Sequence, residues 1–151
     1  MSELDDVIAP EAVLAAVSVS SKKTLLHSLA AAASAQWSCD ASVVGERLMA
    51  REKLGSTGFG GGIAIPHARL ERFDRVRGLF ARLTRPIEFA AVDDLPVDLV
   101  FLLLSPTDAG AEHLKALARV SRKLRDPALT ARLRGAGSSD ALFAMLTRDA
   151  G

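Results

Sequence analysis

The residues with the clearest chemical potential lie in one stretch, REKLGSTGFGGGIAIPHARL (residues 51–70). It places five glycines within residues 55–62 and then a single histidine, His67, directly after a proline. Glycine permits positive φ and close backbone approach, whereas Pro66 fixes its own φ and pushes Ile65 towards extended geometry. The stretch therefore predicts a pliable loop joined to a stiff arm that presents one imidazole to a docking partner. A mobile surface loop is the alternative interpretation of the glycines taken alone.

The glycines do not form either of the common nucleotide-binding motifs. A P-loop needs a lysine after its last glycine, and no lysine follows Gly60, Gly61 or Gly62. The dinucleotide fingerprint needs glycines at relative positions one, three and six, and counting from Gly58 or Gly60 puts isoleucine in sixth place. β-Branched residues rather than a helix follow the loop, so the sequence does not predict a nucleotide site.

The surrounding sequence predicts the elements that must hold this stretch in place. Ser20 or Ser21 is a good helix N-cap, and Asp40 is a second one, for a helix that Gly55 ends. The apolar run VDLVFLLL (97–104) is typical of a central strand buried on both faces. The expected helices are residues 21–36, 40–53, 109–125, 126–135 and 138–148. The expected strands are 63–65, 76–83 and 97–104, residues 13–19 are either a short strand or a connector, and turns are expected at Pro86 and at Asp93–Asp94.

This order of elements predicts an α/β fold. Helices bracket the strands, and some strands follow one another without a helix between them, so we expect a mixed β-sheet flanked by helices on both faces. The length of 151 residues fits a single domain that covers residues 1–151.

Composition narrows the class of function. Lys plus Arg number 19 and Asp plus Glu number 18, a balance that offers no large field for nucleic acid. Cys39 is the only cysteine, so an intrachain disulfide and a metal-ligating cysteine pair are both excluded. The N-terminal residues do not resemble a signal peptide, and no apolar run approaches ~18 residues. We expect a cytoplasmic protein that has no metal site, no nucleic-acid partner and no membrane insertion.

The stretch 51–70 closely resembles the phosphorylation-site signature of enzyme IIA proteins of the mannitol/fructose type in the bacterial phosphoenolpyruvate-dependent phosphotransferase system. Within that family the resemblance is to the nitrogen-regulatory branch. It continues through PIEFAAVDDLPVDLVFLLLSP (86–106) and HLKALARVSRKLRD (113–126), and so covers most of the chain. The fold that it implies, a mixed sheet with helices on both sides, agrees with the order of elements.

The resemblance implies that His67 accepts a phosphoryl group from a phosphohistidine on a small HPr-like carrier, without a cofactor. It also implies that Arg51 and His113 line the same site. The residue types suit this chemistry, because a neutral imidazole is a good nucleophile near pH 7 and a guanidinium grips phosphate oxygens with two donors. His113 is expected near the start of a helix, where the dipole favours a neutral ring. His27 has no such context and is interpreted as structural or solvent-facing.

Two further sets of residues are candidates in this region. Backbone N–H groups of the loop, including that of Gly58, and the hydroxyls of Ser56 and Thr57 could donate to phosphate. Phe59 and Ile63 could form an apolar docking patch, with ordinary core packing as the alternative. Departures from the family pattern (Phe59 for isoleucine, Gly61 for asparagine and Ala68 for glycine) leave the histidine intact and affect mainly the docking contacts.

Three functions remain open from the sequence. The first is a nitrogen-regulatory carrier that controls other proteins, such as kinases or ion transporters, according to its phosphorylation state. The second is the IIA subunit of a fructose- or mannitol-type sugar transporter. The third is a regulatory binding module without phosphotransfer, against which the presence of His67 argues. The free-standing chain, with no membrane segment or second domain, favours the first.

Overall fold

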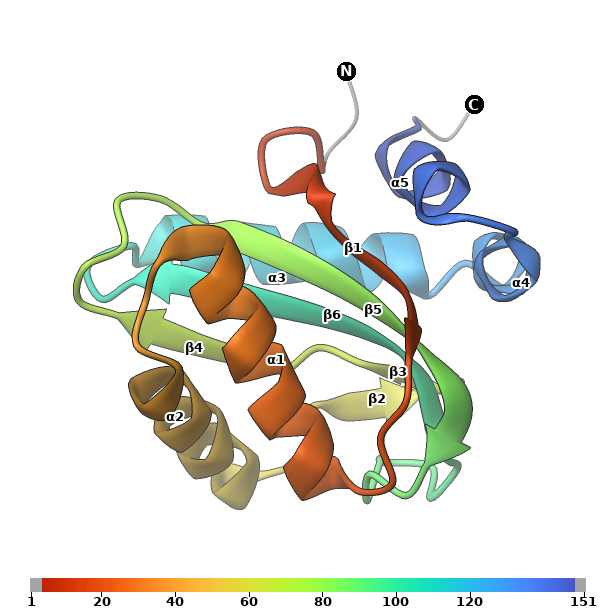
Figure 1. Cartoon of the computed structure of the whole chain (residues 1–151), viewed down its shortest axis with the longest axis horizontal. Coiled ribbons are helices and arrows are strands. Elements are labelled where there is room, and N and C mark those ends of the chain that lie inside the picture. The colour runs from red at the N-terminus through yellow and green to blue at the C-terminus, as the bar shows by residue number, and fades with distance from the viewer. Residues whose placement is uncertain (1–3, 149–151) are drawn as a thin grey trace.

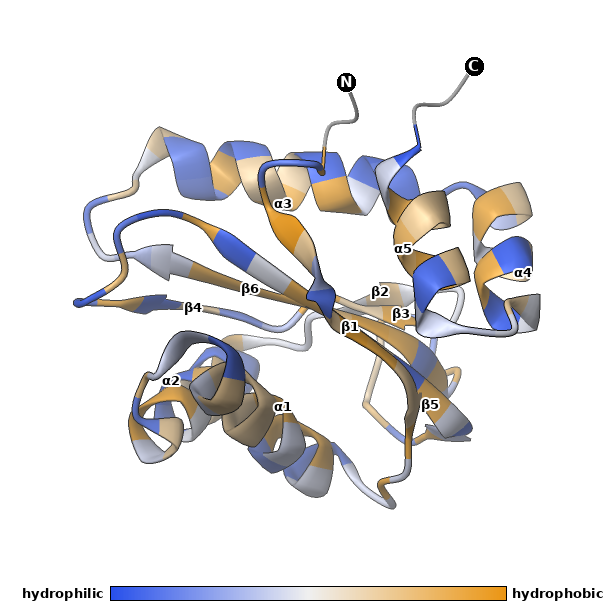
Figure 2. Cartoon of the chain, turned by 45° about the horizontal axis from the view of Figure 1, so that its top comes forward, coloured by the Kyte–Doolittle hydropathy of each residue, from blue (hydrophilic) through white to orange (hydrophobic). Residues whose placement is uncertain are grey.

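A mixed six-stranded sheet lies between two layers of helices in the part of the chain that the computed structural model describes, residues 4–148 (Figures 1 and 2). The strand order is β1-β5-β6-β3-β2, and β4 also pairs with β6. This architecture confirms the predicted fold class. The elements are β1 (Ile8–Val17), α1 (Lys22–Trp37), α2 (Ala41–Leu54), β2 (Gly58–Gly60), β3 (Ile63–Ala64), β4 (His67–Leu70), β5 (Arg77–Ile87), β6 (Val97–Pro106), α3 (Ala111–Leu124), α4 (Pro127–Gly135) and α5 (Ser139–Thr147).

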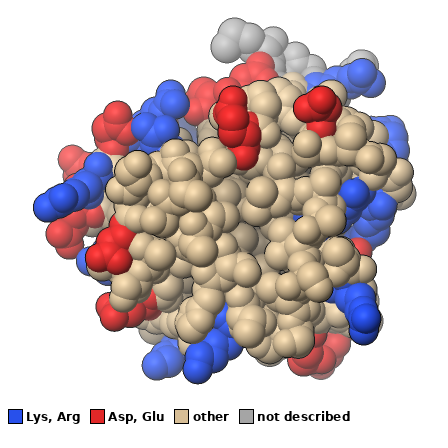
Figure 3. Space-filling model, viewed as in Figure 1, with Lys and Arg blue, Asp and Glu red and all other residues tan. Residues whose placement is uncertain are grey.

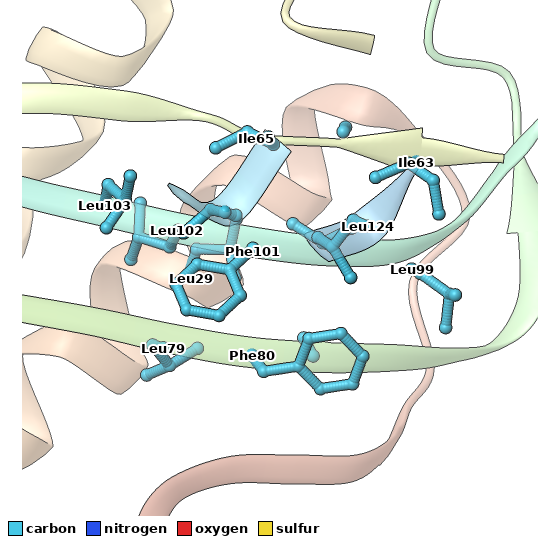
Figure 4. Packing of buried hydrophobic residues seen from close by; sticks show 14 of the residues in the cluster. Leu29, Ile63, Ile65, Leu79, Phe80, Leu99, Phe101, Leu102, Leu103 and Leu124 are labelled. Atoms are coloured by element: carbon cyan, nitrogen blue, oxygen red, sulfur yellow. The ribbon is translucent and has the colours of Figure 1, made fainter. Parts of the chain in front are cut away.

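Strand β6 is the centre of the fold, as its apolar run predicts. It pairs antiparallel with β5, where Phe80 lies opposite Phe101, and parallel with both β3 and β4. The two phenylalanine rings meet edge to face with their centroids 6.4 Å apart, a favoured aromatic geometry. Side chains from Leu99 to Leu104 are fully buried because helices cover both faces of this strand (Figure 4).

The helices begin where their capping residues predict. The Ser21 hydroxyl accepts a hydrogen bond from the backbone of Thr24 and completes a capping box, and Asp40 caps α2 through the N–H of Ser42. Helices α1 and α2 cover one face of the sheet, and α3, α4 and α5 lie on the other (Figure 2). Helix α3 begins at Ala111 rather than at residue 109, which places His113 in its first turn.

Two predictions differ from the structure. Strand β1 begins at Ile8 instead of residue 13, and its register with β5 is irregular between Ile8 and Val13, the stretch that contains Pro10. The predicted turn at Pro86 lies inside β5, in the stretch between Arg82 and Ile87 where the register with β6 shifts. Proline lacks an N–H and is tolerated at such an irregularity, where the regular ladder is interrupted. The short strands β2 and β4 were not predicted.

Charged side chains are interspersed around the rim of the face shown in Figure 3, with few at its centre. Helix α1 lies in front of the sheet in the same view (Figure 1), and Ser28, Ala31 and Ala35 are among its exposed residues. No helix within residues 4–148 combines the length and the apolar character needed to cross a bilayer.

Candidate functional site

His67 is the first residue of β4 and follows a break in the strand that begins with β3. The parallel ladder with β6 continues across the break, since Pro66 accepts a hydrogen bond from the N–H of Leu103 at 3.0 Å and His67 lies opposite Leu103. Proline needs no partner for an N–H at this position, so the chain can turn without leaving a donor unpaired. The imidazole of His67 is therefore carried by a strand that is hydrogen-bonded to the central strand β6.

The hydrogen bonds of the His67 ring define its tautomer. Nδ1 lies 2.8 Å from the carbonyl oxygen of Ile65, which can only accept, so Nδ1 carries the proton and the lone pair is on Nε2. Arg51, in the last turn of α2, donates from Nε to that lone pair at 3.2 Å. Its Nη1 donates to the Gly55 carbonyl at 2.9 Å, which fixes the guanidinium in place.

His113 is the third residue of the predicted group, and it lies on α3, on the opposite face of the sheet from α2 (Figure 2). Its ring centroid is 5.5 Å from that of His67, with 56° between the ring planes. Its Nδ1 lies 2.6 Å from the hydroxyl of Ser105, and both residues are buried. The fold thus brings together the three predicted residues, Arg51, His67 and His113, from α2, β4 and α3.

Both rings favour the neutral form in this environment. Burial, followed by the positive charge of Arg69 and the neighbouring His67, lowers the pKa of His113 to about 4. Burial also lowers the pKa of His67; the bond to Ile65 and the charge of Glu52 oppose this effect, whereas Arg51 and Arg69 add to it. Each ring is therefore neutral at neutral pH.

The low pKa of His113 predicts a loss of stability in mild acid. A histidine pKa that is lower in the folded state means that the unfolded chain binds more protons as the pH falls. The contribution of neutral His113 to the free energy of unfolding is therefore complete above about pH 6.5 and is lost as the pH falls through about 4. We expect the free energy of unfolding of a His113→Gln variant to fall less than that of the parent over this window, by about 2–3 kcal/mol. Urea unfolding at several pH values measures the difference, and parallel curves for the two proteins would contradict it.

The predicted phosphate donors of the loop are occupied by the protein itself. Thr57 donates its N–H and its hydroxyl to the carboxylate of Glu52, and the Ser56 hydroxyl bonds the Phe89 carbonyl and the N–H of Gly58. Gly58 serves close packing, since an added Cβ would lie 2.8 Å from the Cβ of Ala91. In this structure the hydroxyls of Ser56 and Thr57 and the N–H groups of Thr57 and Gly58 therefore form bonds within the protein.

The rest of the glycine-rich stretch forms a β-hairpin. Strands β2 and β3 pair antiparallel, and Gly60, Gly61 and Gly62 make the turn with φ values of 111°, 67° and 84°. The Gly61 N–H donates to Asp93 at 3.0 Å, and its carbonyl accepts from Arg134 at 2.7 Å. Both polar groups of Gly61 are therefore bonded to other elements of the fold.

The two predicted docking residues are placed differently. Ile63 is 2% exposed and packs in the core, so it follows the core-packing alternative and cannot form an exposed patch. Phe59 is half-buried, and the guanidinium of Arg125 lies 4.9 Å from its ring centroid. Large apolar side chains that are exposed lie closer to the site in sequence: Leu54, three residues after Arg51, and Leu114, next to His113.

Sequence reasoning missed three neighbours of the site. Glu52 directly follows Arg51, but a charge at a helix end gives no signal of burial. Ser105 lies eight residues before His113, and only the turn between β6 and α3 brings the two together. The third neighbour, Arg69, is exposed, yet its charge acts on both rings. His27 is exposed on α1, as expected. Residues 4–148 contain no group of three His, Cys, Asp or Glu side chains that could hold a metal ion.

Comparison with known proteins identifies the class that this fold and site define. Residues 6–149 match the family model described as "Phosphoenolpyruvate-dependent sugar phosphotransferase system, EIIA 2". The chain belongs to this family, which confirms the resemblance found in the sequence.

Within the family, its similarity is to nitrogen regulatory proteins. It is 50% identical over 143 residues to the nitrogen regulatory protein of Bradyrhizobium diazoefficiens, with 95% of this chain and 94% of the relative covered. It is 42% identical over 147 residues to that of Escherichia coli, with 96% and 90% covered. The crystal structure of nitrogen regulatory protein IIA-Ntr from Neisseria meningitidis superposes with a TM-score of 0.89 at 35% identity, covering 94% of this chain and 97% of that one.

Proposed function

We propose that this protein is a phosphoryl carrier of the nitrogen-regulatory type, which receives a phosphoryl group on Nε2 of His67 from an HPr-like carrier. One observation carries the proposal. The Ile65 carbonyl holds the proton on Nδ1, so the nucleophilic lone pair of His67 lies on Nε2, beside the guanidinium of Arg51. The family match and the names of the relatives support the same conclusion.

The transfer step needs little covalent help from the protein. The Nε2 lone pair of His67 attacks phosphorus, the P–N bond of the donor phosphohistidine breaks, and its electron pair returns to the donor's imidazole nitrogen. Arg51 moves its donors from the lone pair to the phosphoryl oxygens and offsets their charge. The proton on Nδ1 stays in its bond to Ile65, which stabilises the positive charge that the phosphorylated ring acquires.

His113 contributes as a neutral donor in this proposal. If the Ser105 hydroxyl donates to Nδ1 of His113, the ring carries its proton on Nε2 and can bond a phosphoryl oxygen. We expect His113→Ala to slow phosphoryl transfer by roughly a hundredfold, the lower end of the usual cost of losing one preorganised donor, while the acceptor remains. Rapid-quench measurement of the transfer rate tests this, with the final extent of labelling as the internal control. An unchanged rate would remove His113 from the site.

Leu54 and Leu114, which are exposed and lie close in sequence to Arg51 and His113, support a docking surface for the carrier in this region. The added phosphoryl group brings up to about two negative charges to this surface, enough to change the choice of partner. The nitrogen-regulatory relatives favour an output through regulated proteins, such as kinases or ion transporters, over a sugar transporter. A relay that draws on phosphoenolpyruvate supports a location in the cytoplasm.

Incubation with phosphoenolpyruvate, enzyme I and the HPr-like carrier tests the function as a whole. We expect a stoichiometric label that is acid-labile and base-stable, and ³¹P–¹⁵N coupling that assigns it to Nε2 of a histidine. Omission of the carrier is the control and should abolish labelling. A fully reconstituted system that leaves the parent protein unlabelled would favour the binding module without phosphotransfer.

A further inference from the structure

Glu52 is a buried carboxylate beside the site that the transfer step does not itself use. Its side chain is 5% exposed, and Oε1 pairs with Lys22 Nζ at 2.9 Å and accepts from the Thr57 N–H at 3.0 Å, while Oε2 accepts from the Thr57 hydroxyl. Lys22 also donates to the Phe89 carbonyl at 3.2 Å and lies 4.3 Å from the centroid of its ring. A buried carboxylate is costly unless it is paired and hydrogen-bonded, so these groups hold one another in place.

A continuous chain of hydrogen bonds leads from Glu52 to the ring of His67. Glu52 anchors Thr57, whose carbonyl accepts from the Ile65 N–H at 3.1 Å. The carbonyl of Ile65 in turn accepts from Nδ1 of His67 at 2.8 Å. Arg51, the residue before Glu52, contacts Nε2 of the same ring. Two adjacent residues of α2 therefore act on the two nitrogens of the His67 ring. Arg51 contacts Nε2 directly, and Glu52 acts on Nδ1 through the backbone of Thr57 and Ile65.

We propose that Glu52, with Lys22 as its counter-ion, is a positioning residue that keeps His67 in the tautomer with a free lone pair on Nε2. A neutral imidazole can carry its proton on either nitrogen, and the place of the Ile65 carbonyl decides which. Truncation of Glu52 removes two bonds from Thr57 and so weakens the hold of Thr57 on Ile65, whose carbonyl bonds Nδ1. The consequence for transfer rests on the proposed function, whereas the tautomer is a property of the unphosphorylated protein.

Asp98 offers a matched control for Glu52. It too is a carboxylate that anchors the glycine-rich stretch: it binds Arg134 through two bonds of 2.9 Å, and Arg134 donates to the Gly61 carbonyl at 2.7 Å. Asp98 is not part of the chain of bonds that ends at His67. A change that follows from general loosening of the stretch would therefore appear in Asp98→Ala as well as in Glu52→Ala.

The experiment measures ¹⁵N chemical shifts of the ring nitrogens in histidine-labelled protein, together with the rate of phosphoryl transfer. For Glu52→Ala we expect a mixture of His67 tautomers and transfer about ten- to a hundredfold slower, the usual cost of losing a group that orients a reactive side chain. For Glu52→Gln we expect a smaller shift in the same direction, because the neutral amide loses the charge that pairs with Lys22 and the bond to the Thr57 hydroxyl must reverse its direction. Asp98→Ala should keep the parental tautomer and a rate within about twofold.

A parental tautomer and rate in Glu52→Gln would overturn the proposal, whether or not Glu52→Ala folds. Equal changes in Asp98→Ala would also overturn it, because they would show general loosening. If the parent protein takes up no phosphoryl group, the proposed function fails, and the tautomer of His67 still decides the role of Glu52.

Discussion

A His67→Ala variant is expected to take up no phosphoryl group from the phosphorylated carrier. The reason is chemical, because the alanine side chain has no lone pair, and His113, the other ring at the site, lies buried with Nδ1 held by Ser105. The loss should be complete, in contrast to the slower but full labelling expected of His113→Ala. Labelling with radioactive phosphoenolpyruvate, followed to its plateau, measures the outcome.

His27→Ala is the matched control for this experiment. His27 is exposed on α1, and it is the one histidine of the chain besides His67 and His113. We expect this variant to label at the parental rate and extent. Residual label in His67→Ala, stable in base and lost in acid, would place the acceptor on another histidine and refute the assignment.

Replacing Arg51 by lysine is expected to slow phosphoryl transfer by about 10²–10³-fold, the effect usually seen when one preorganised donor to a developing charge is lost. The guanidinium bonds Nε2 of His67 through Nε and the Gly55 carbonyl through Nη1 at the same time. A lysine ammonium is a point charge that cannot reproduce this planar pair of donors. Single-turnover transfer from the carrier measures the rate.

Arg47→Lys is a close control, since Arg47 lies one turn earlier on α2 and also bonds β4. It donates to the Arg69 carbonyl at 2.8 Å and forms a surface ion pair with the exposed Glu71. Surface ion pairs contribute little to stability. We expect its transfer rate to stay within about twofold of the parent. Equal rates for Arg47→Lys and Arg51→Lys would show that the planar guanidinium of Arg51 has no special part in transfer.

Local sequence signals were sufficient for much of the fold. Ser21 and Asp40 begin their helices because side-chain caps act within a few residues, and the run 97–104 becomes the central strand because it is apolar throughout. Pro86 was misplaced because whether a proline breaks a strand depends on the register with the neighbouring strand, here shifted between Arg82 and Ile87. That register is set by tertiary pairing.

In the candidate site, too, some features follow from the local sequence and others depend on tertiary contacts. Arg51, His67 and His113 could be predicted because the family signature gives their positions in the chain. The engagement of Ser56 and Thr57 within the protein could not, since it depends on a carboxylate and a carbonyl that approach only after folding. The burial of Ile63 has the same origin, because an isoleucine beside a glycine turn can face either solvent or the sheet.

The attachment of β4 to the central strand bears on how other proteins could sense phosphorylation. Because the acceptor ring is carried by a backbone bonded to β6 at both Pro66 and His67, we expect the two forms of the protein to have nearly identical shapes. A binding protein that tells them apart must then respond to surface potential rather than to a conformational change. Such discrimination would weaken at high ionic strength, where exposed charges are screened over a few ångströms.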